Sequence, residues 1–197
     1  MKRFILILIL TLSIQSWTKA DDIRDFEIEG MSLGDSLLDF FSKDDLVEAA
    51  KKVAPYKHGD YYIEQLFISK KFRTYDAVKL TYIALDKNYY LYGIAGLIYF
   101  ESDFDNCLKT QKKVIKSIIK LFPDVDKNEY DKTISHYDKS KKSYYIETNF
   151  EFKDESMVRV YCNNWSEELT KKNGWKDSLN VIMNDISFLE YLRKTYQ

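Results

Sequence analysis

The sequence predicts an α+β fold: a two-layer sandwich in which an antiparallel sheet of about five strands carries helices on one face. Three observations support this class. Short segments alternate apolar and polar side chains, the segment 103–122 repeats apolar side chains at helical spacing, and strands do not alternate regularly with helices as a parallel sheet requires. With six glycines, two prolines and no linker-like stretch, residues 21–197 are expected to form a single domain.

The first two strands are predicted over residues 78–84 and 89–100. In the first, apolar side chains alternate with polar ones such as Lys79. The second is apolar on both faces, which is typical of a central strand. Gly93 and Gly96 inside it indicate a bulge or the close approach of another backbone.

Three further strands are predicted over residues 146–152, 158–162 and 179–183. Their apolar side chains face one way, whereas Arg159 and Asn180 point to the opposite face. The segment 124–142 is polar and has no periodicity, so we expect a mobile loop there.

Helix starts are marked by capping residues. Ser42 and Asp45 form a variant of the capping box before a helix over residues 46–53. Asp103, or the serine before it, caps the long helix. Asn184, or the aspartate after it, begins a final helix.

Residues 1–20 have the three-part layout of a secretory signal peptide. Lys2 and Arg3 form a basic start, residues 4–14 form an apolar run, and a small-residue cleavage site ends at Ala20. The run of about 11 residues is well short of the roughly 20 that a membrane-spanning helix needs. We expect cleavage near Ala20, a periplasmic or secreted location and no stable membrane span after processing. An uncleaved anchor is the alternative.

Composition restricts the partners. The chain has 30 basic and 31 acidic residues, and a mildly acidic chain with scattered lysines has no electrostatic attraction for nucleic acid. We therefore expect no nucleic-acid partner. The two histidines and two cysteines have no close spacing, so we expect neither a metal site nor a cofactor.

The two cysteines, Cys107 and Cys162, both belong to the exported part. In an oxidising compartment such an even pair favours a disulfide, and two buried free thiols are the alternative. Cys107 lies beside the apolar stripe of the long helix and Cys162 on the inward face of a strand. We expect them to meet where the helix packs on the sheet.

A possible nucleophile lies near the start of the expected domain. The segment Gly34-Asp-Ser-Leu37 is similar to the nucleophile block of the GDSL esterase and lipase family, which implies that Ser36 attacks an ester. That family also has Asp-x-x-His near the C-terminus, whereas Thr133 stands three residues before His136, the last histidine. A serine without a base is a weak nucleophile. We expect Ser36 to cap a helix, and keep the esterase as an alternative.

Sixteen tyrosines are unusual for this length. Core and strand positions account for most of them, because tyrosine is both a strand former and an amphipathic surface residue. The remainder are candidates for a binding face whose partner is an envelope protein, a glycan or a small ligand. The candidate binding residues are Tyr89, Tyr90, Tyr92, Trp165 and Trp175.

The segment FEIEGMSLGDSLLDFF, residues 26–41, follows the short signal. It resembles an uncharacterised family of small exported proteins of marine bacteria, and the similarity extends through Tyr92-Gly-Ile94 and the Cys107 helix to the end of the chain. The resemblance implies export and no activity. We therefore expect an exported, non-enzymatic envelope protein with a binding or interaction role.

Overall fold

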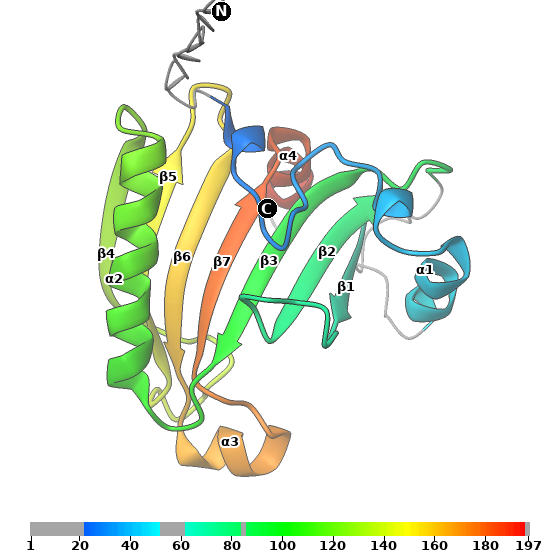
Figure 1. Ribbon diagram of the computed structural model, residues 1–197. Helices are drawn as coiled ribbons and strands as arrows, with labels where there is room; N and C mark the ends of the chain where they lie inside the picture. Colours follow the sequence, from blue (N-terminus) through cyan, green and yellow to red (C-terminus); the bar gives the residue numbers. More distant parts are fainter. Residues whose placement is uncertain (1–21, 52–61, 84–85, 196–197) are drawn as a thin grey trace, which may run out of the picture.

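One antiparallel sheet of seven strands forms the centre of the molecule, in the order β1-β2-β3-β7-β6-β5-β4 (Figure 1). This computed structural model describes residues 22–51, 62–83 and 86–195. The expected signal peptide with its cleavage site near Ala20 lies outside these ranges, as does His58. The strands are β1 (Tyr62–Phe67), β2 (Ala77–Ile83), β3 (Leu91–Tyr99), β4 (Asp126–Ile134), β5 (Tyr144–Glu151), β6 (Met157–Asn164) and β7 (Ser178–Asn184).

Four α-helices and two short 3-10 helices accompany the sheet in the described ranges. They are η1 (Ile23–Asp25), η2 (Leu37–Asp39), α1 (Lys43–Ala50), α2 (Phe104–Leu121), α3 (Glu167–Asn173) and α4 (Ile186–Thr195). The expected caps are present. The Ser42 hydroxyl accepts a hydrogen bond from the Asp45 amide and donates to its carboxylate, and Asp103 accepts from the Asn106 amide.

The predicted α+β class is confirmed, but the strand count of about five is wrong. Both missed strands lie at the edges of the sheet. The segment 124–142, expected to be a loop, contains β4, whose residues are nearly all exposed. A strand with neither face covered needs no apolar alternation, and its charged side chains discourage pairing with another chain. A register shift between Tyr130 and Thr133 interrupts the edge further.

The hydrophobic core lies between one face of the sheet and two elements, α2 and the N-terminal segment 23–46. Ile118 of α2 and Leu37 of the N-terminal segment are fully buried there, against Val160 and Val181 of the central strands. Gln111 of α2 is also buried, and its amide nitrogen donates to the backbone oxygens of Ile146 and Val160 at 2.9 and 3.0 Å. We call this side of the sheet the covered face.

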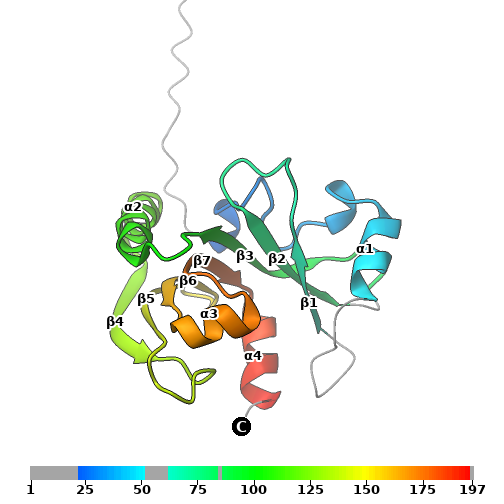
Figure 2. The ribbon, with the colours of Figure 1, turned by 90° about the horizontal axis from the view of Figure 1, so that it is seen from below.

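The expectation that all helices lie on one face is wrong. In Figure 2, α2 lies on one side of the sheet and α4 on the other. Phe188 and Tyr191 of α4 pack against Tyr62, with ring centroids 5.0 and 4.8 Å apart. Tyr62 pairs with Ile83, so it points away from the covered face. Helix α4 therefore covers one end of the opposite side, which we call the open face.

A carboxylate ties the N-terminal segment to the connection between β1 and β2. Glu29 accepts hydrogen bonds from the backbone amides of Arg73, Thr74 and Tyr75 at 2.7 to 2.9 Å. Burial alone would raise the pKa of Glu29, but the three amides outweigh it and lower that pKa. The same connection places the Tyr75 ring against Gly96, where a Cβ atom would lie 2.4 Å from it. Gly96 thus makes room for a side chain, whereas the sequence predicted a bulge or the close approach of another backbone.

The predicted disulfide is confirmed. Cys107 and Cys162 are bonded, with Cα atoms 6.0 Å apart, and both are fully buried. The bond joins α2 to β6, at the helix–sheet contact expected from the sequence. It therefore crosslinks the two layers of the covered face.

Removing this crosslink should lower the free energy of unfolding. The two cysteines are 55 residues apart, and closing a loop of that length stabilises a fold by about 4 kcal/mol in the chain-entropy model. We expect the double variant Cys107→Ser/Cys162→Ser to lose stability of that order in urea denaturation. Reductant should destabilise the native chain to the same extent and leave the double variant unaffected. Equal stability of the two proteins without reductant would contradict this assignment.

Candidate functional site

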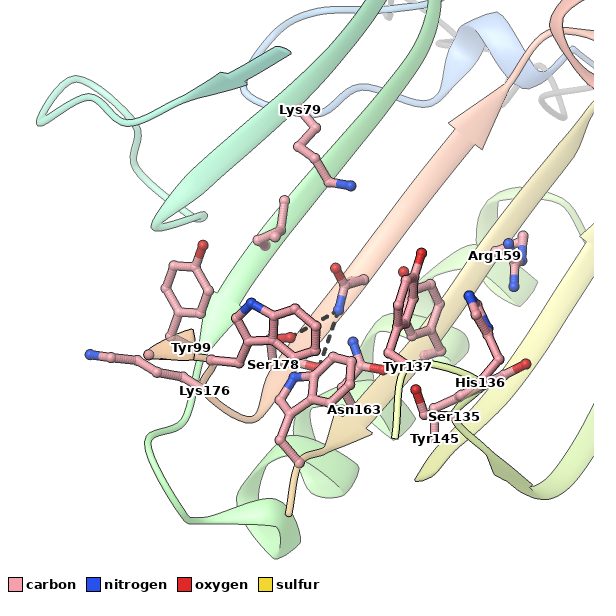
Figure 3. Close-up of a pocket in the computed structure, with 16 residues that line it drawn as sticks. Lys79, Tyr99, Ser135, His136, Tyr137, Tyr145, Arg159, Asn163, Lys176 and Ser178 are labelled. Carbon is pink, nitrogen blue, oxygen red and sulfur yellow. Dashed lines mark hydrogen bonds between the residues drawn. The ribbon is translucent and has the colours of Figure 1, made fainter. Parts of the chain in front are cut away.

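The open face carries a pocket of about 750 Å³ at the end that α4 leaves uncovered (Figure 3). Strands β2, β3, β5, β6 and β7 contribute its lining, together with the loop between β4 and β5 and the connection from β6 to β7. The lining residues are Lys79, Leu97, Tyr99, Ser135, His136, Tyr137, Tyr145, Arg159, Tyr161, Asn163, Trp165, Gly174, Trp175, Lys176, Ser178 and Asn180.

Strand pairing arranges these side chains in parallel rows. Directly opposed residues of antiparallel strands share a face, so each row can be followed from strand to strand. The rows on the open face are Lys79–Ala95–Ile182–Arg159, then Ala77–Leu97–Asn180–Tyr161, then Tyr99–Ser178–Asn163–Tyr145. The first row lies nearest α4, and the third nearest the loops that form the rim.

The centre of the pocket floor is apolar. Ala95 and Leu97 of β3 form a small buried cluster, against which Tyr99 and Ile182 pack. Beside it, the Asn180 amide donates to the backbone and hydroxyl oxygens of Ser178. The floor thus offers an apolar strip bordered by amide and hydroxyl groups.

Aromatic rings form the rim. The ring centroids of Trp165 and Trp175 are 4.6 Å apart, and Tyr137 meets Trp175 edge-on at 5.9 Å. The Trp165 amide donates to the Asp177 carboxylate at 2.9 Å, which holds the indole-bearing backbone beside β7. Burial raises the pKa of Asp177, and the amide opposes that shift.

A second carboxylate organises the loop between β4 and β5, which carries His136 and Tyr137. Asp138 accepts hydrogen bonds from the amide and hydroxyl of both Ser140 and Ser143, at 2.6 to 2.9 Å. These bonds hold the pKa of Asp138 well below its usual range. The Ser143 hydroxyl also accepts from the Ser166 amide at 2.8 Å, at the start of α3. One network therefore joins the two loops of the rim.

The basic side chains of the floor are paired with acids beside the pocket. Lys79 lies 2.6 Å from the Glu64 carboxylate, and Arg159 contacts Glu147 through Nε and Nη2, at 3.2 and 2.5 Å. Burial alone would lower the pKa of Lys79 and of Arg159, but the paired carboxylates outweigh it and raise both. Both side chains stay positively charged at neutral pH.

The structure separates the predicted binding residues. Trp165 and Trp175 lie together in the pocket. Tyr89 is buried in the core against Tyr82, with ring centroids 5.7 Å apart. The two remaining candidates line a different hollow of about 430 Å³ beside Arg24 and Asp185, and these are Tyr90 and Tyr92.

Ser36 lies outside the pocket and acts as a cap. Its hydroxyl donates to the Asn88 backbone oxygen at 2.7 Å and accepts from the Leu38 amide at 3.3 Å. Within the described ranges no hydrogen bond joins it to a histidine. His136, the histidine that those ranges include, lies in the rim of the pocket.

Several pocket residues were not predicted from the sequence as binding residues. These are Lys79, Tyr99, Tyr145, Arg159, Tyr161, Asn163 and Asn180. The alternation of strands 78–84, 158–162 and 179–183 already separates Lys79, Arg159 and Asn180 from the apolar face. That signal identifies the face. It does not show that β2 and β6 share a sheet with only two strands between them.

Comparisons with known proteins add no relative: no family model matches the chain, and neither a curated protein nor a solved structure does. In the part of the chain that the structure describes, no helix is both long and apolar enough to cross a bilayer. Over the same residues, no cluster of histidine, cysteine and carboxylate side chains is placed to hold a metal ion.

The Asp138 network should control the order of the rim. We expect Asp138→Asn to accelerate exchange of the Ser140 and Ser143 amides about tenfold at neutral pH, because a charged acceptor is replaced by a neutral one. Amide exchange measured by NMR tests this. Asp131→Asn, a change on exposed β4, should leave these amides unaffected. Unchanged exchange in the Asp138 variant would contradict the role of this carboxylate.

The pH dependence follows from the same bonds. Because the folded pKa of Asp138 lies below the unfolded value of about 3.9, its contribution is complete above that value. It is lost only as the pH falls through the lower folded pKa. The loop should therefore stay ordered at pH 4 and loosen under more acidic conditions, which amide line widths would report.

Proposed function

We propose that this chain is an exported, non-enzymatic binding protein whose ligand is a saccharide held in the open-face pocket. The observation that carries the proposal is the pair of indoles, Trp165 and Trp175, beside a floor bordered by amide and hydroxyl groups. Flat aromatic rings pack against the C–H face of a sugar ring, while Asn163 and Asn180 supply polar groups for its hydroxyls.

The dimensions of the pocket support a small ligand. A volume of about 750 Å³ lies within the range of about 300–1,000 Å³ that is usual for small-molecule sites. Tyr99, Tyr145 and Tyr161 each present a ring with a polar tip to this space, which suits a ligand with apolar faces and a polar edge.

The chemistry of the lining favours binding over hydrolysis. Glycoside hydrolysis uses a pair of carboxyl groups that flank the scissile bond. Among the described residues, no aspartate or glutamate lines the pocket. The hydroxyl of Ser36, the candidate nucleophile of the alternative esterase, is engaged with a backbone oxygen away from this pocket.

Export is part of the proposal. The disulfide between Cys107 and Cys162 is typical of an oxidising compartment, and the layout of residues 1–20 is that of a signal peptide. The likeness of residues 26–41 to small exported proteins of marine bacteria agrees with this location. The binding protein would then act in the periplasm or outside the cell.

Export predicts a new N-terminus. The chain expressed with its own leader in a Gram-negative host should be recovered from the periplasmic fraction beginning at Asp21. N-terminal sequencing, together with alkylation that finds no free thiol, tests both points. Recovery from the cytosol beginning at Met1 would contradict the location.

Saccharide binding can be followed through the pocket itself. The chain has three tryptophans, and cleavage after Ala20 removes Trp17, so the exported protein keeps Trp165 and Trp175 as its fluorophores. We expect their emission to change on titration with at least one of galactotriose, cellotriose, chitotriose and trigalacturonate. Replacing either indole by alanine should weaken that binding about 3- to 10-fold, since one stacked ring is lost.

A matched control comes from an aromatic residue outside the pocket. Tyr90→Ala removes an exposed ring that lines the separate hollow, and should leave the affinity unchanged. If none of the four saccharides changes the emission, or if Tyr90→Ala weakens binding as much as the indole variants, the proposed site is wrong.

A further inference from the structure

Two basic side chains reach the pocket from opposite sides. Lys79 of β2 and Arg159 of β6 occupy one cross-strand row, in which Ala95 and Ile182 lie between them. Three strand spacings of about 4.8 Å place their backbones roughly 14 Å apart. In Figure 3 the Lys79 amine and the Arg159 guanidinium lie on either side of β7. Long side chains at this separation leave room for one small group between them.

The Arg159 guanidinium is held in place and still has donors to offer. Its partner, Glu147, has only 7% of its side chain exposed, against 33% for Arg159. The pair uses Nε and Nη2, and no hydrogen bond among the described residues uses Nη1. A guanidinium carries five N–H groups in a planar fork that matches the two oxygens of a carboxylate. Glu147 thus orients the Arg159 guanidinium, and the N–H groups at its outer edge remain available to a ligand.

Lys79 has a similar arrangement. One N–H of its ammonium donates to Glu64, which leaves two donors, and about a third of the side chain is exposed. The pairing with Glu64 keeps the ammonium charged as water leaves the pocket. Both basic groups therefore retain charge and donors next to the apolar strip.

The Tyr161 hydroxyl is a third donor between these two. Its ring packs beneath the Arg159 guanidinium, 5.4 Å from the centroid, and no hydrogen bond among the described residues uses its hydroxyl. Burial raises the pKa of Tyr161, while Lys79 and Arg159 both act to lower it. Tyr161 belongs to the cross-strand row next to that of Lys79 and Arg159, so its hydroxyl lies on the same face as the two basic groups.

On the basis of the binding function above, we propose that the saccharide is acidic, and that its carboxylate docks between Lys79 and Arg159. The Tyr161 hydroxyl donates to the same carboxylate. The sugar rings then extend over Leu97 towards the indoles of the rim. No acidic side chain among the described residues lines the pocket, and the carboxylates of Glu64 and Glu147 beside it are each paired with one of the two basic groups.

The test compares two matched probes on the exported protein, which begins at Asp21 and keeps Trp165 and Trp175. Trigalacturonate and galactotriose differ in their carboxylates, and tryptophan emission reports the binding of each. We expect trigalacturonate to bind at least tenfold more tightly at low salt, since a hydrogen bond between charged groups is stronger than one between neutral groups. Lys79→Met should weaken trigalacturonate about tenfold and leave galactotriose unchanged, and Tyr161→Phe should weaken trigalacturonate more than it weakens galactotriose.

Arg159 requires a paired substitution. Removing it alone would leave Glu147 buried without a partner, which destabilises a fold. Arg159→Gln is therefore combined with Glu147→Gln, and thermal unfolding verifies that the double variant folds. It should lose the preference for trigalacturonate. Lys171→Met is the matched control, because Lys171 lies outside the pocket lining, pairs with exposed Glu167 and should not affect the preference.

The outcomes separate this proposal from the binding function itself. If galactotriose binds as tightly as trigalacturonate, or if Lys79→Met weakens both equally, the acidic ligand is wrong and saccharide binding stands. If Lys171→Met removes the preference as fully as Lys79→Met, general surface charge explains it and the docking site is wrong. If neither probe nor any neutral trisaccharide changes the emission, both proposals fail.

Discussion

The two faces of the seven-stranded sheet are covered unequally, and the rest of the structure depends on this difference. Helix α2 and the N-terminal segment bury one face, whereas α4 covers only one end of the other. Because side chains alternate along a strand, each central strand must be apolar towards α2 and can differ on its other side. In β6, Val160 and Cys162 are buried in the core while Tyr161 faces the pocket. The pocket is thus built from the residues that the core does not use.

Periodicity predicted the parts of the fold that the core determines. The central strands, the long helix over residues 103–122, the capping residues and the cystine all depend on burial, and burial leaves a pattern in the sequence. The edge strand β4 leaves no such pattern. Residues 126–134 alternate no apolar side chains because neither face of β4 is covered. Only the pairing with β5 makes that segment a strand, and pairing is not visible in a single sequence.

The site was predictable only in part, for a related reason. Aromatic content drew attention to Trp165 and Trp175, and alternation placed Arg159 and Asn180 on the side away from the core. Bringing Lys79 near Arg159 requires β7, from the end of the chain, to insert between β3 and β6. Aromatic content also indicated Tyr89 as a binding residue, but the structure buries its side chain in the core. Residue type indicates what a side chain can do, and strand order decides where it does so.

The disulfide between Cys107 and Cys162 affects when the pocket reaches its final geometry after synthesis. Cys162 follows Tyr161 directly in β6, so their side chains lie on opposite faces of the sheet. Cys162 is bonded to Cys107 of α2 on the covered face, and Tyr161 packs against Arg159 on the open face. In a reducing cytoplasm this strand would lack its covalent tether to α2. We expect a newly synthesised chain to acquire full ligand affinity only after oxidation. Under the proposed export and binding function, the redox state of the compartment would then decide where the pocket binds its ligand.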